Sequence, residues 1–245
     1  MNRDGASEAL ILDAWHANAQ AWEAAVREGR IESRKLATDQ AIVELVLSRA
    51  PRTVIDVGCG EGWLARALAA QGIEVLGVDA VPALVEAARA KGGGDFRVVS
   101  YEDMAAGALK QRADVVVCNF SLLGGASVDA LLAAVPALLE ADGVLAIQTL
   151  HPLMAGVEPY ADGWRDGSWA GCGDGFGQPA PWYFRTLGSW VTAIQKAGLT
   201  LLAIKEPIHP HTGRPASVIF LAGASYRGNG DEQASRRSVS RHRTE

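Results

Sequence analysis

Apolar positions recur at spacings of three and four near the start of the chain and then gather into short runs. The first stripe is formed by Leu12, Trp15, Ala19, Trp22 and Val26. This spacing is typical of one face of an amphipathic helix. Gly29 is expected to interrupt that helix, and a second helix is expected from the N-cap residue Thr38 to just before Pro51. Residues 1–50 are therefore predicted to form a helical cap.

From residue 53 onward, apolar runs of strand length alternate with helical patterns. The expected strands are 53–57, 74–78, 96–99, 113–118, 143–150, 199–205 and 217–221. The expected helices are 63–71, 82–91, 128–140 and 187–197. Such alternation predicts an α/β fold, a Rossmann-like and mostly parallel sheet with helices on both faces. This domain is expected to span residues 51–225.

Two stretches break the alternation. Residues 151–185 are rich in Gly, Pro and Trp, and a long irregular segment in a compact domain is usually functional. We expect this stretch to be an insertion after the fifth strand that covers the substrate. Residues 226–245 carry almost no apolar side chains, so we expect a disordered tail there.

The strongest chemical signal is the run VIDVGCGEGW at residues 54–63, where an apolar strand leads into alternate glycines. Gly58, Gly60 and Gly62 permit positive φ and remove the Cβ that would block a ligand. Ligands of open parallel sheets bind beyond the carboxyl ends of the strands. A tight turn without a ligand would show the same glycines. A dinucleotide fingerprint would place its third glycine where this chain has Trp63.

A second acid, Asp79, ends the next predicted strand. A carboxylate at this edge can accept hydrogen bonds from both hydroxyls of a ribose. It can also cap the helix that begins near Pro82, and the two roles are compatible.

These features resemble the class I S-adenosylmethionine-dependent methyltransferases, in particular small-molecule members of the ubiquinone and menaquinone methyltransferase type. Residues 56–62 look like the first motif of that family, and Asp79 looks like its ribose-binding acid. Residues 115–120 are similar to the fourth motif beside the methyl group, and residues 138–145 to the segment that follows. The resemblance covers residues 53–224. It implies a seven-stranded sheet whose last strand is antiparallel, with S-adenosyl-L-methionine as cofactor and S-adenosyl-L-homocysteine as product.

The resemblance also implies a set of cofactor-binding residues at the glycine loop and the strand ends. They are Arg34, Asp56, Gly58, Cys59, Gly60, Gly62, Trp63, Asp79, Ala80, Ser100, Tyr101, Glu102, Asn119, Phe120 and Ser121. The chain departs from the family after the third strand, where many members have an adenine-binding Asp and this chain has Ser100. Arg34 is either the partner of the methionine carboxylate, which its planar fork suits, or an exposed arginine on a solvated helix.

The acceptor side is predicted from the sheet edge, the cap and the insertion. His151 follows the fifth strand, where a histidine serves as a general base or else anchors the insertion. The candidate substrate-binding residues are Asn18, Trp22, Trp164, Trp169, Trp182, Tyr183 and Arg185. Their aromatic rings predict either a pocket for a flat or apolar small molecule or a small core of the insertion itself. Arg185 either contacts the substrate or joins the insertion to the domain.

Composition narrows the partners. The chain has 23 Lys and Arg against 28 Asp and Glu, a net charge of −5, which disfavours a nucleic-acid partner, although the basic tail keeps a tRNA base as an alternative acceptor. The three cysteines have no metal or redox spacing, so we expect no metal site and a cytoplasmic protein. No run approaches the roughly 18 apolar residues of a membrane span. A monomer or a homodimer is expected.

The sequence therefore predicts an enzyme that transfers a methyl group to a small molecule by in-line displacement. The positive sulfonium activates the methyl group, so the protein chiefly has to align the acceptor. The two rival functions are an NAD(P)-dependent oxidoreductase on a Rossmann sheet and a non-catalytic protein that binds S-adenosylmethionine.

Overall fold

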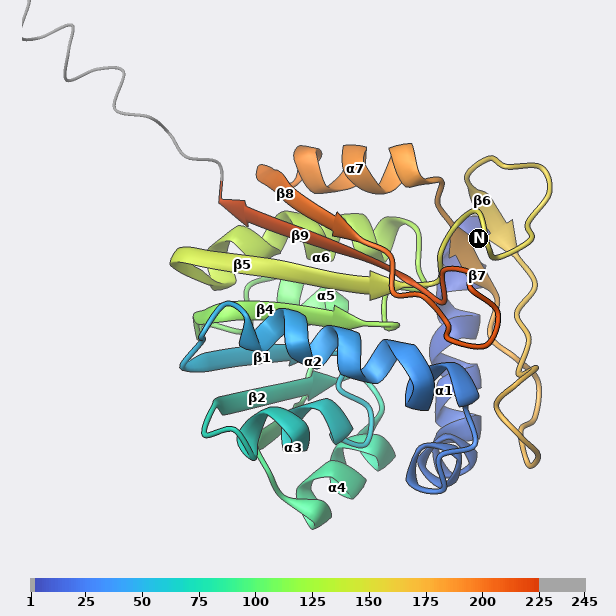
Figure 1. Cartoon of the computed structure of the whole chain (residues 1–245), viewed down its shortest axis with the longest axis horizontal. Helices are drawn as coiled ribbons and strands as arrows, with labels where there is room; N and C mark the ends of the chain where they lie inside the picture. The colour runs from blue at the N-terminus through green and yellow to red at the C-terminus, as the bar shows by residue number, and fades with distance from the viewer. Residues whose placement is uncertain (1–2, 225–245) are drawn as a thin grey trace, which may run out of the picture.

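The computed structural model describes residues 3–224, in which a central sheet lies between two layers of helices (Figure 1). The strands of this sheet are β1 (Thr53–Val57), β2 (Glu74–Asp79), β3 (Asp95–Val98), β4 (Ala113–Asn119), β5 (Leu139–Thr149), β8 (Leu199–Lys205) and β9 (Val218–Ala224). The helices are α1 (Arg3–Arg27), the π-helix η1 (Arg34–Thr38), α2 (Asp39–Leu47), α3 (Trp63–Ala69), α4 (Pro82–Lys91), α5 (Tyr101–Ala105), α6 (Ala126–Leu138) and α7 (Leu187–Lys196). The tail predicted for residues 226–245 lies outside the described residues.

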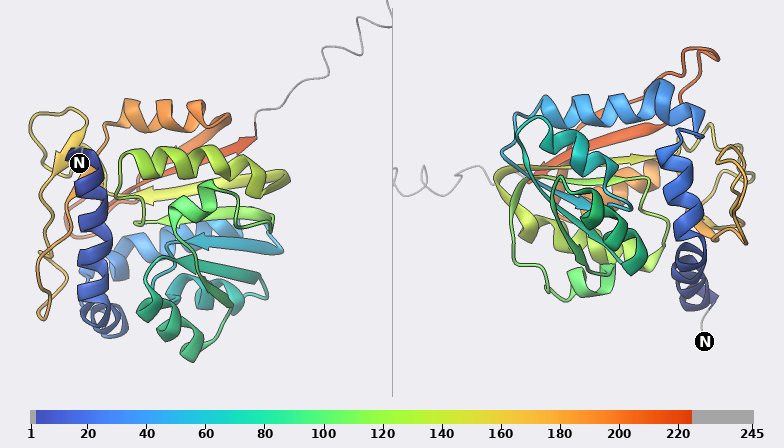
Figure 2. Two further views of the ribbon diagram at one scale, coloured as in Figure 1. Left: turned by 180° about the vertical axis from the view of Figure 1, so that it is seen from behind. Right: turned by 90° about the horizontal axis from the view of Figure 1, so that it is seen from below.

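The strand order is β3-β2-β1-β4-β5-β9-β8. The pairs among β1 to β5 are parallel, and β9 runs antiparallel to both β5 and β8. This confirms the predicted Rossmann-like sheet of seven strands with the last strand antiparallel. The carboxyl ends of the parallel strands meet at one edge, which α1 and the insertion cover (Figures 1 and 2).

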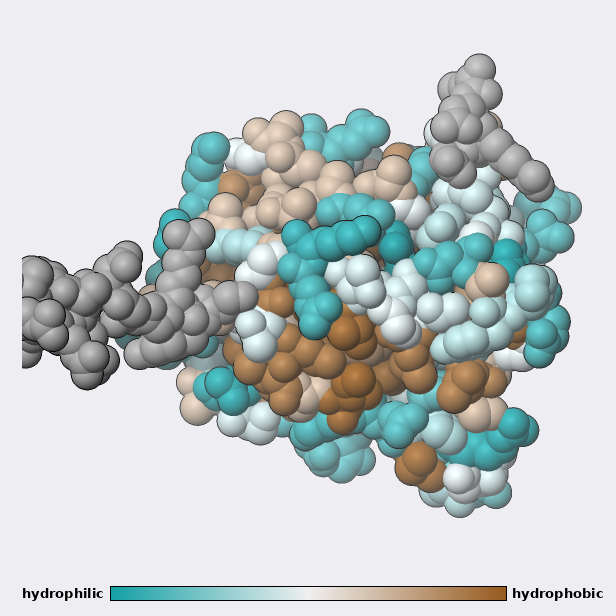
Figure 3. All heavy atoms as spheres, turned by 90° about the horizontal axis from the view of Figure 1, so that it is seen from above, coloured by the Kyte–Doolittle hydropathy of each residue, from teal (hydrophilic) through white to brown (hydrophobic). Residues whose placement is uncertain are grey.

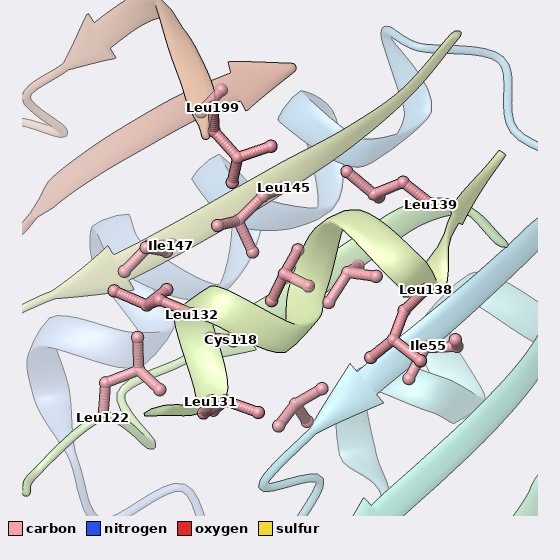
Figure 4. Packing of buried hydrophobic residues seen from close by; sticks show 14 of the residues in the cluster. Ile55, Cys118, Leu122, Leu131, Leu132, Leu138, Leu139, Leu145, Ile147 and Leu199 are labelled. Carbon is pink, nitrogen blue, oxygen red and sulfur yellow. The ribbon is translucent and has the colours of Figure 1, made fainter. Parts of the chain in front are cut away.

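Apolar side chains on both faces of the sheet explain why the central strands are buried. On one face, the core includes Leu131 of α6, Ile194 of α7 and Ile55 of β1, and Figure 4 shows Ile55, Leu131 and Leu145 in this cluster. On the other face, α2, α3 and α4 supply the core. Burial of such side chains gives about 1.5–3 kcal/mol each, which holds the strand ends, and with them the site, in fixed positions.

Several elements differ from the sequence-based prediction. Helix α6 ends at Leu138 and β5 begins at Leu139, whereas the helix was predicted to reach residue 140; the buried Leu139 pairs with Ala113 instead. The short helix α5 was not predicted. The insertion contains a small antiparallel hairpin of β6 (Gly163–Arg165) and β7 (Trp182–Phe184).

The edge strand β8 leaves Leu202 and Ile204 exposed, at 52% and 46%. Figure 3 looks down on the α7 and β8 side of the molecule and shows hydrophobic atoms gathered on that face. Within residues 3–224, no helix combines the length and the apolar character that crossing a membrane requires.

Candidate cofactor and acceptor site

A cavity of about 860 Å³ lies at the carboxyl edge of the sheet. Ligand pockets range from about 300 to 1,000 Å³, so this cavity has room for a cofactor and a small acceptor together. Its lining comes from the cap, the glycine loop, the end of β4 and the insertion, and includes Trp15, Trp22, Arg34, Gly58, Gly60, Trp63, Asn119, Phe120, Trp169, Trp182, Tyr183 and Arg185. A smaller hollow of about 460 Å³ lies at the amino ends of the strands, where open α/β sheets do not bind their ligands.

Gly60 is the glycine of the loop at which an added side chain would enter this cavity. Its φ is +55°, and a Cβ added there would approach only Nε1 of Trp22, at 3.5 Å. A side chain would therefore project into the space that a ligand needs. The Gly60 N–H donates to Oδ2 of Asp79 at 2.9 Å, which ties the glycine loop to the end of β2.

Gly58 and Gly62 are required for packing rather than for ligand approach. Both have positive φ, +73° and +81°. A Cβ at Gly58 would lie 2.3 Å from Cβ of Ser121, and a Cβ at Gly62 would lie 2.9 Å from Cζ of Phe96. Gly58 thus lets the β4 loop approach the glycine loop, and Ser121 strengthens that contact by donating from Oγ to the Val57 carbonyl at 2.7 Å.

Asp79 is half-buried beside the loop, with Ala80 following it. Besides the bond from Gly60, its Oδ1 accepts from the Val81 N–H at 2.9 Å, just before α4. Burial raises the pKa of this carboxyl, and the backbone bonds oppose that rise. Each carboxylate oxygen has two lone-pair sites, so both oxygens can still accept from ribose hydroxyls. The capping role and the ribose role are compatible, as predicted.

Asp56 lies under the glycine loop and is 1% exposed. Burial, and then the charge of Asp79, raise the pKa of Asp56 from 3.8 to about 7. Its Oδ2 is buried and has no hydrogen-bond partner among the residues that the structure describes. The thiol of Cys59 is also buried, and burial raises its pKa, which makes it an inert packing group.

Arg34 on η1 is buried, at 9% exposed, which rules out the alternative of an exposed arginine. Its Nε donates to Oδ1 of Asp39 at 3.0 Å, and its Cζ lies 4.7 Å from the centre of the Trp63 ring. Nη1 is buried and has no hydrogen-bond partner in the described part of the chain. A guanidinium held by an ion pair and a ring, with one nitrogen unused, is suited to bind a carboxylate.

The end of β4 presents a second unused polar atom. Oδ1 of Asn119 is buried and has no hydrogen-bond partner among residues 3–224, and Asn119 lines the cavity. The next residue, Phe120, has a φ of +54°, which is rare for a bulky residue and is found mostly where function requires it. Arg34 and Asn119 together offer a donor and an acceptor to a zwitterion such as the methionine portion of the cofactor, so the residues present fit that group.

The residues after β3 form the N-terminus of α5. Ser100 is the N-cap: its Oγ accepts from the Asp103 N–H at 3.1 Å and donates to Oδ2 of Asp103 at 2.7 Å. The Tyr101 hydroxyl donates to the Ser121 carbonyl at 2.9 Å, and Glu102 is exposed. The Ser100 side chain is thus committed to the capping box. Contact of this segment with adenine remains a prediction.

Asn18 has a different task from the one predicted. It is 1% exposed and does not belong to the cavity lining. Its Nδ2 donates to the carbonyls of Ala14 and Gln178, at 2.7 and 3.1 Å, and its Oδ1 accepts from the Gly177 N–H at 2.6 Å. Asn18 therefore fastens the insertion to α1, and its amide has little capacity left for a substrate.

A group of aromatic rings completes the contact between cap and insertion. The Trp169 ring stacks on Phe176 at 4.5 Å and meets Trp15 edge-on at 5.4 Å, and Trp15 meets Trp22 edge-on at 5.1 Å. Trp15, Trp22 and Trp169 all line the cavity. These rings therefore pack the insertion against the cap and also form part of the cavity wall.

His151 is 3% exposed, and its Nε2 lies 2.7 Å from Oε1 of Glu206, just after β8. It does not line the cavity, although its neighbour Pro152 does. Its Nδ1 is buried and has no hydrogen-bond partner among the described residues. The structure thus shows His151 joined to Glu206, and its role as a general base stays a prediction. His209, between β8 and β9, also lines the cavity.

The aromatic residues of the hairpin divide between two positions. Trp182 and Tyr183 line the cavity, while Trp164 packs edge-on against Tyr183 at 5.5 Å and does not line it. Arg185 donates from Nη2 to the Gly125 carbonyl at 2.8 Å and pairs with Oδ1 of Asp129 at 3.0 Å. It thus joins the insertion to α6 and also lines the cavity.

Glu61 is a buried residue of the loop that the sequence analysis did not single out. It is 1% exposed, and its Oε2 lies 2.6 Å from Nη2 of Arg66 and 2.8 Å from Nζ of Lys91. Lys91 also pairs with Glu23 of α1 at 3.1 Å. Its position as an acid between two loop glycines is the sequence feature that could have identified it.

Among the described residues, no cluster of His, Cys, Asp and Glu side chains could hold a metal ion.

This sheet order, with a glycine loop after β1 and an acid at the end of β2, defines a class I S-adenosylmethionine-dependent methyltransferase. A protein family described as "Methyltransferase domain" matches residues 30–204. The chain belongs to this family, which confirms the predicted superfamily, and its cofactor is S-adenosylmethionine.

Known proteins agree with this assignment. The chain is 37% identical over 109 residues to a ubiquinone biosynthesis O-methyltransferase of Xylella fastidiosa, a match that spans 42% of this chain and 43% of the relative. Its fold is similar to that of a 1,6-didemethyltoxoflavin-N1-methyltransferase of Burkholderia thailandensis (TM-score 0.65, 16% identity, 92% of each chain). It is also similar to that of a magnesium protoporphyrin IX methyltransferase of Synechocystis (TM-score 0.62, 17% identity, 89% of this chain and 100% of the other).

Proposed function

We propose that this methyltransferase acts on a small molecule that binds in the 860 Å³ cavity between the sheet, α1 and the insertion. The observation that carries this proposal is the closure of the site. The insertion lies across the carboxyl edge of the sheet beside α1 (Figure 2) and is held there by Asn18 and Trp169. A bulky polymer would have to displace these contacts, whereas a small flat molecule fits the tryptophan-lined space.

The cofactor side of the site follows from the loop and the cap. Asp79 would accept hydrogen bonds from the ribose hydroxyls, and the open backbone at Gly60 would let the cofactor approach the loop. Nη1 of Arg34 would pair with the methionine carboxylate, and Oδ1 of Asn119 would accept from a donor beside it. These assignments rest on the buried unpartnered atoms of Arg34 and Asn119.

Alignment is the main chemical task of the protein. The bound cofactor supplies a methyl group already activated by the positive sulfonium. Rigid aromatic walls, including Trp182 and Tyr183, would hold the acceptor in line with that methyl group, and positioning of this kind lowers a barrier by up to about 7–11 kcal/mol in ideal cases. Nε2 of His151 lies 2.7 Å from Oε1 of Glu206, and His151 does not line the cavity, so the proposed reaction assigns it no proton transfer.

The experiment is a transfer assay with methyl-labelled S-adenosylmethionine. The full chain is incubated with a panel of phenolic, amine and heterocyclic small molecules, and in parallel with bulk tRNA. Label in a small-molecule product supports the proposal. Label in tRNA alone contradicts it, and binding of the cofactor without transfer to any acceptor favours the non-catalytic alternative.

Three further assignments belong to the same proposal. The net charge of −5 argues against a nucleic-acid partner. The three cysteines, all unpaired in the structure, are consistent with a reducing cytoplasm. A monomer or a homodimer is expected, because the cavity is complete within one chain.

A further inference from the structure

Charge is unevenly distributed in the acceptor part of the cavity. The acidic residues of the lining, Glu32, Glu158 and Asp166, are exposed at its rim. The basic residues of the hairpin lie deeper. Arg185 is 6% exposed, and the Nε atom of Arg165 is buried.

The two hairpin arginines each lie against an aromatic ring of β7. Cζ of Arg165 is 5.6 Å from the centre of the Phe184 ring, and Cζ of Arg185 is 5.0 Å from that of the Tyr183 ring. The rings fix the guanidinium planes without neutralising their charge. Both arginines line the same cavity as Trp182 and Tyr183.

Neither guanidinium is fully compensated by the protein. Within residues 3–224, Arg165 donates only to backbone carbonyls, those of Trp164, Pro159 and Ala161. Arg185 has one acidic partner in the described part of the chain, Asp129, whose side chain is 58% exposed. The Nε–H of each arginine is buried and has no acceptor among the described residues. A desolvated cation with an unused N–H donor costs free energy unless another group accepts a hydrogen bond from that donor.

Assuming the small-molecule methyltransferase function proposed above, we infer that the acceptor is a flat aromatic molecule with an anionic group, such as a carboxylate, bound beside Arg185 and Arg165. Arg34 is already assigned to the cofactor, which leaves these two cations for the acceptor. The aromatic walls contact the ring of the acceptor, and the guanidinium of Arg185 binds its anionic group. A carboxylate suits this position because arginine presents several donors in one plane.

The test uses matched pairs of probes on the full chain saturated with S-adenosylhomocysteine. Benzoate, 2-naphthoate and 3,4-dihydroxybenzoate are each compared with the corresponding uncharged amide. Binding is followed by tryptophan fluorescence, because Trp169 and Trp182 line the cavity. At least one carboxylate should bind tenfold or more tightly than its amide.

Three variants separate the role of Arg185 from general structure. Arg185→Gln should remove the preference for the carboxylate while S-adenosylhomocysteine still binds. Asp129→Asn changes an exposed partner and frees Arg185, so it should tighten carboxylate binding two- to fivefold even if Arg185→Gln fails to fold. Arg27→Gln, on an exposed part of α1 (56%), should change nothing.

The results distinguish this inference from the proposed function. If the wild type does not bind S-adenosylhomocysteine, the proposed function itself fails. If it binds S-adenosylhomocysteine but no carboxylate binds more tightly than its amide, or Asp129→Asn weakens carboxylate binding, the anionic acceptor is overturned and the methyltransferase assignment stands.

Discussion

The carboxylate of Asp79 accepts a hydrogen bond of 2.9 Å from the backbone N–H of Gly60. One side chain at the end of β2 therefore fixes the loop that follows β1, and the same side chain is the proposed ribose partner. Loop position and cofactor binding depend on the same acid.

Replacing Asp79 tests this double role. Asp79→Ala removes the loop contact and two proposed bonds to ribose, each worth about 1.5–3 kcal/mol when one partner is charged. S-adenosylhomocysteine should then bind at least about 100-fold more weakly. Asp79→Asn retains one acceptor oxygen and should lose less affinity, as measured by calorimetric titration. Equal affinity of wild type and Asp79→Ala would remove Asp79 from the site.

Replacing Gly58 tests whether the glycine loop and the loop after β4 have to approach each other closely. In Gly58→Ala, the new Cβ would lie 2.3 Å from Cβ of Ser121 at a φ of +73°. Overpacking and left-handed strain together should cost about 2–5 kcal/mol in the free energy of unfolding. Gly72→Ala is the control, because Gly72 has a φ of +83° but open space around it and should lose only about 1–2 kcal/mol. Urea unfolding measures both, and equal losses would show that packing at Gly58 is unimportant.

Glu61 is expected to contribute more to stability than either of its cationic partners. Glu61→Ala leaves Arg66 and Lys91, which are 29% and 28% exposed and can return to water. The expected loss is about 2–3 kcal/mol, below the 3–5 kcal/mol of wholly buried pairs. Lys91→Ala should lose only about 1 kcal/mol, because Glu61 keeps Arg66. Arg97→Ala is the control. It removes an exposed ion pair with Asp95 and should lower the free energy of unfolding by less than about 1 kcal/mol. Thermal or urea unfolding measures these losses. A larger loss of unfolding free energy in Lys91→Ala than in Glu61→Ala would contradict the ranking.

Asp56 predicts a pH dependence of stability. Its pKa rises from 3.8 to about 7 on folding because it is buried near Asp79. Between these values the native state binds more protons than the unfolded state, so the free energy of unfolding should fall as the pH rises from about 4 to 7. Asp56→Asn removes this titration and should flatten that part of the profile. Parallel urea unfolding curves at pH 5 and pH 7 measure the difference, and an unchanged slope in Asp56→Asn would contradict the assignment.

Much of the fold and the cofactor loop could be predicted from the sequence, because both depend on local patterns. The alternating glycines from Gly58 to Gly62 and the strand-ending Asp79 report backbone geometry directly. The capping box of Ser100 and Asp103 also has a local signature, Ser-x-x-Asp, so the start of α5 could be predicted from the sequence as well.

The acceptor side was less predictable because it depends on where an irregular segment lies in space. Periodicity places Asn18 and Trp22 on α1, yet only the path of the insertion decides that Asn18 binds the backbone at Gly177 while Trp22 lines the cavity. His151 follows β5 as predicted, but the loop after β8 supplies Glu206 as a partner for its imidazole. The spacing of residues along the chain does not indicate these long-range contacts.

The central claim is that the glycine loop and Asp79 bind S-adenosylmethionine rather than a dinucleotide. Calorimetric titration of the wild-type chain with S-adenosylhomocysteine, and separately with NADH, tests it most directly. We expect one S-adenosylhomocysteine bound per chain with a dissociation constant on the order of micromolar, about −8 kcal/mol, and no measurable binding of NADH. Binding of NADH without S-adenosylhomocysteine would contradict it.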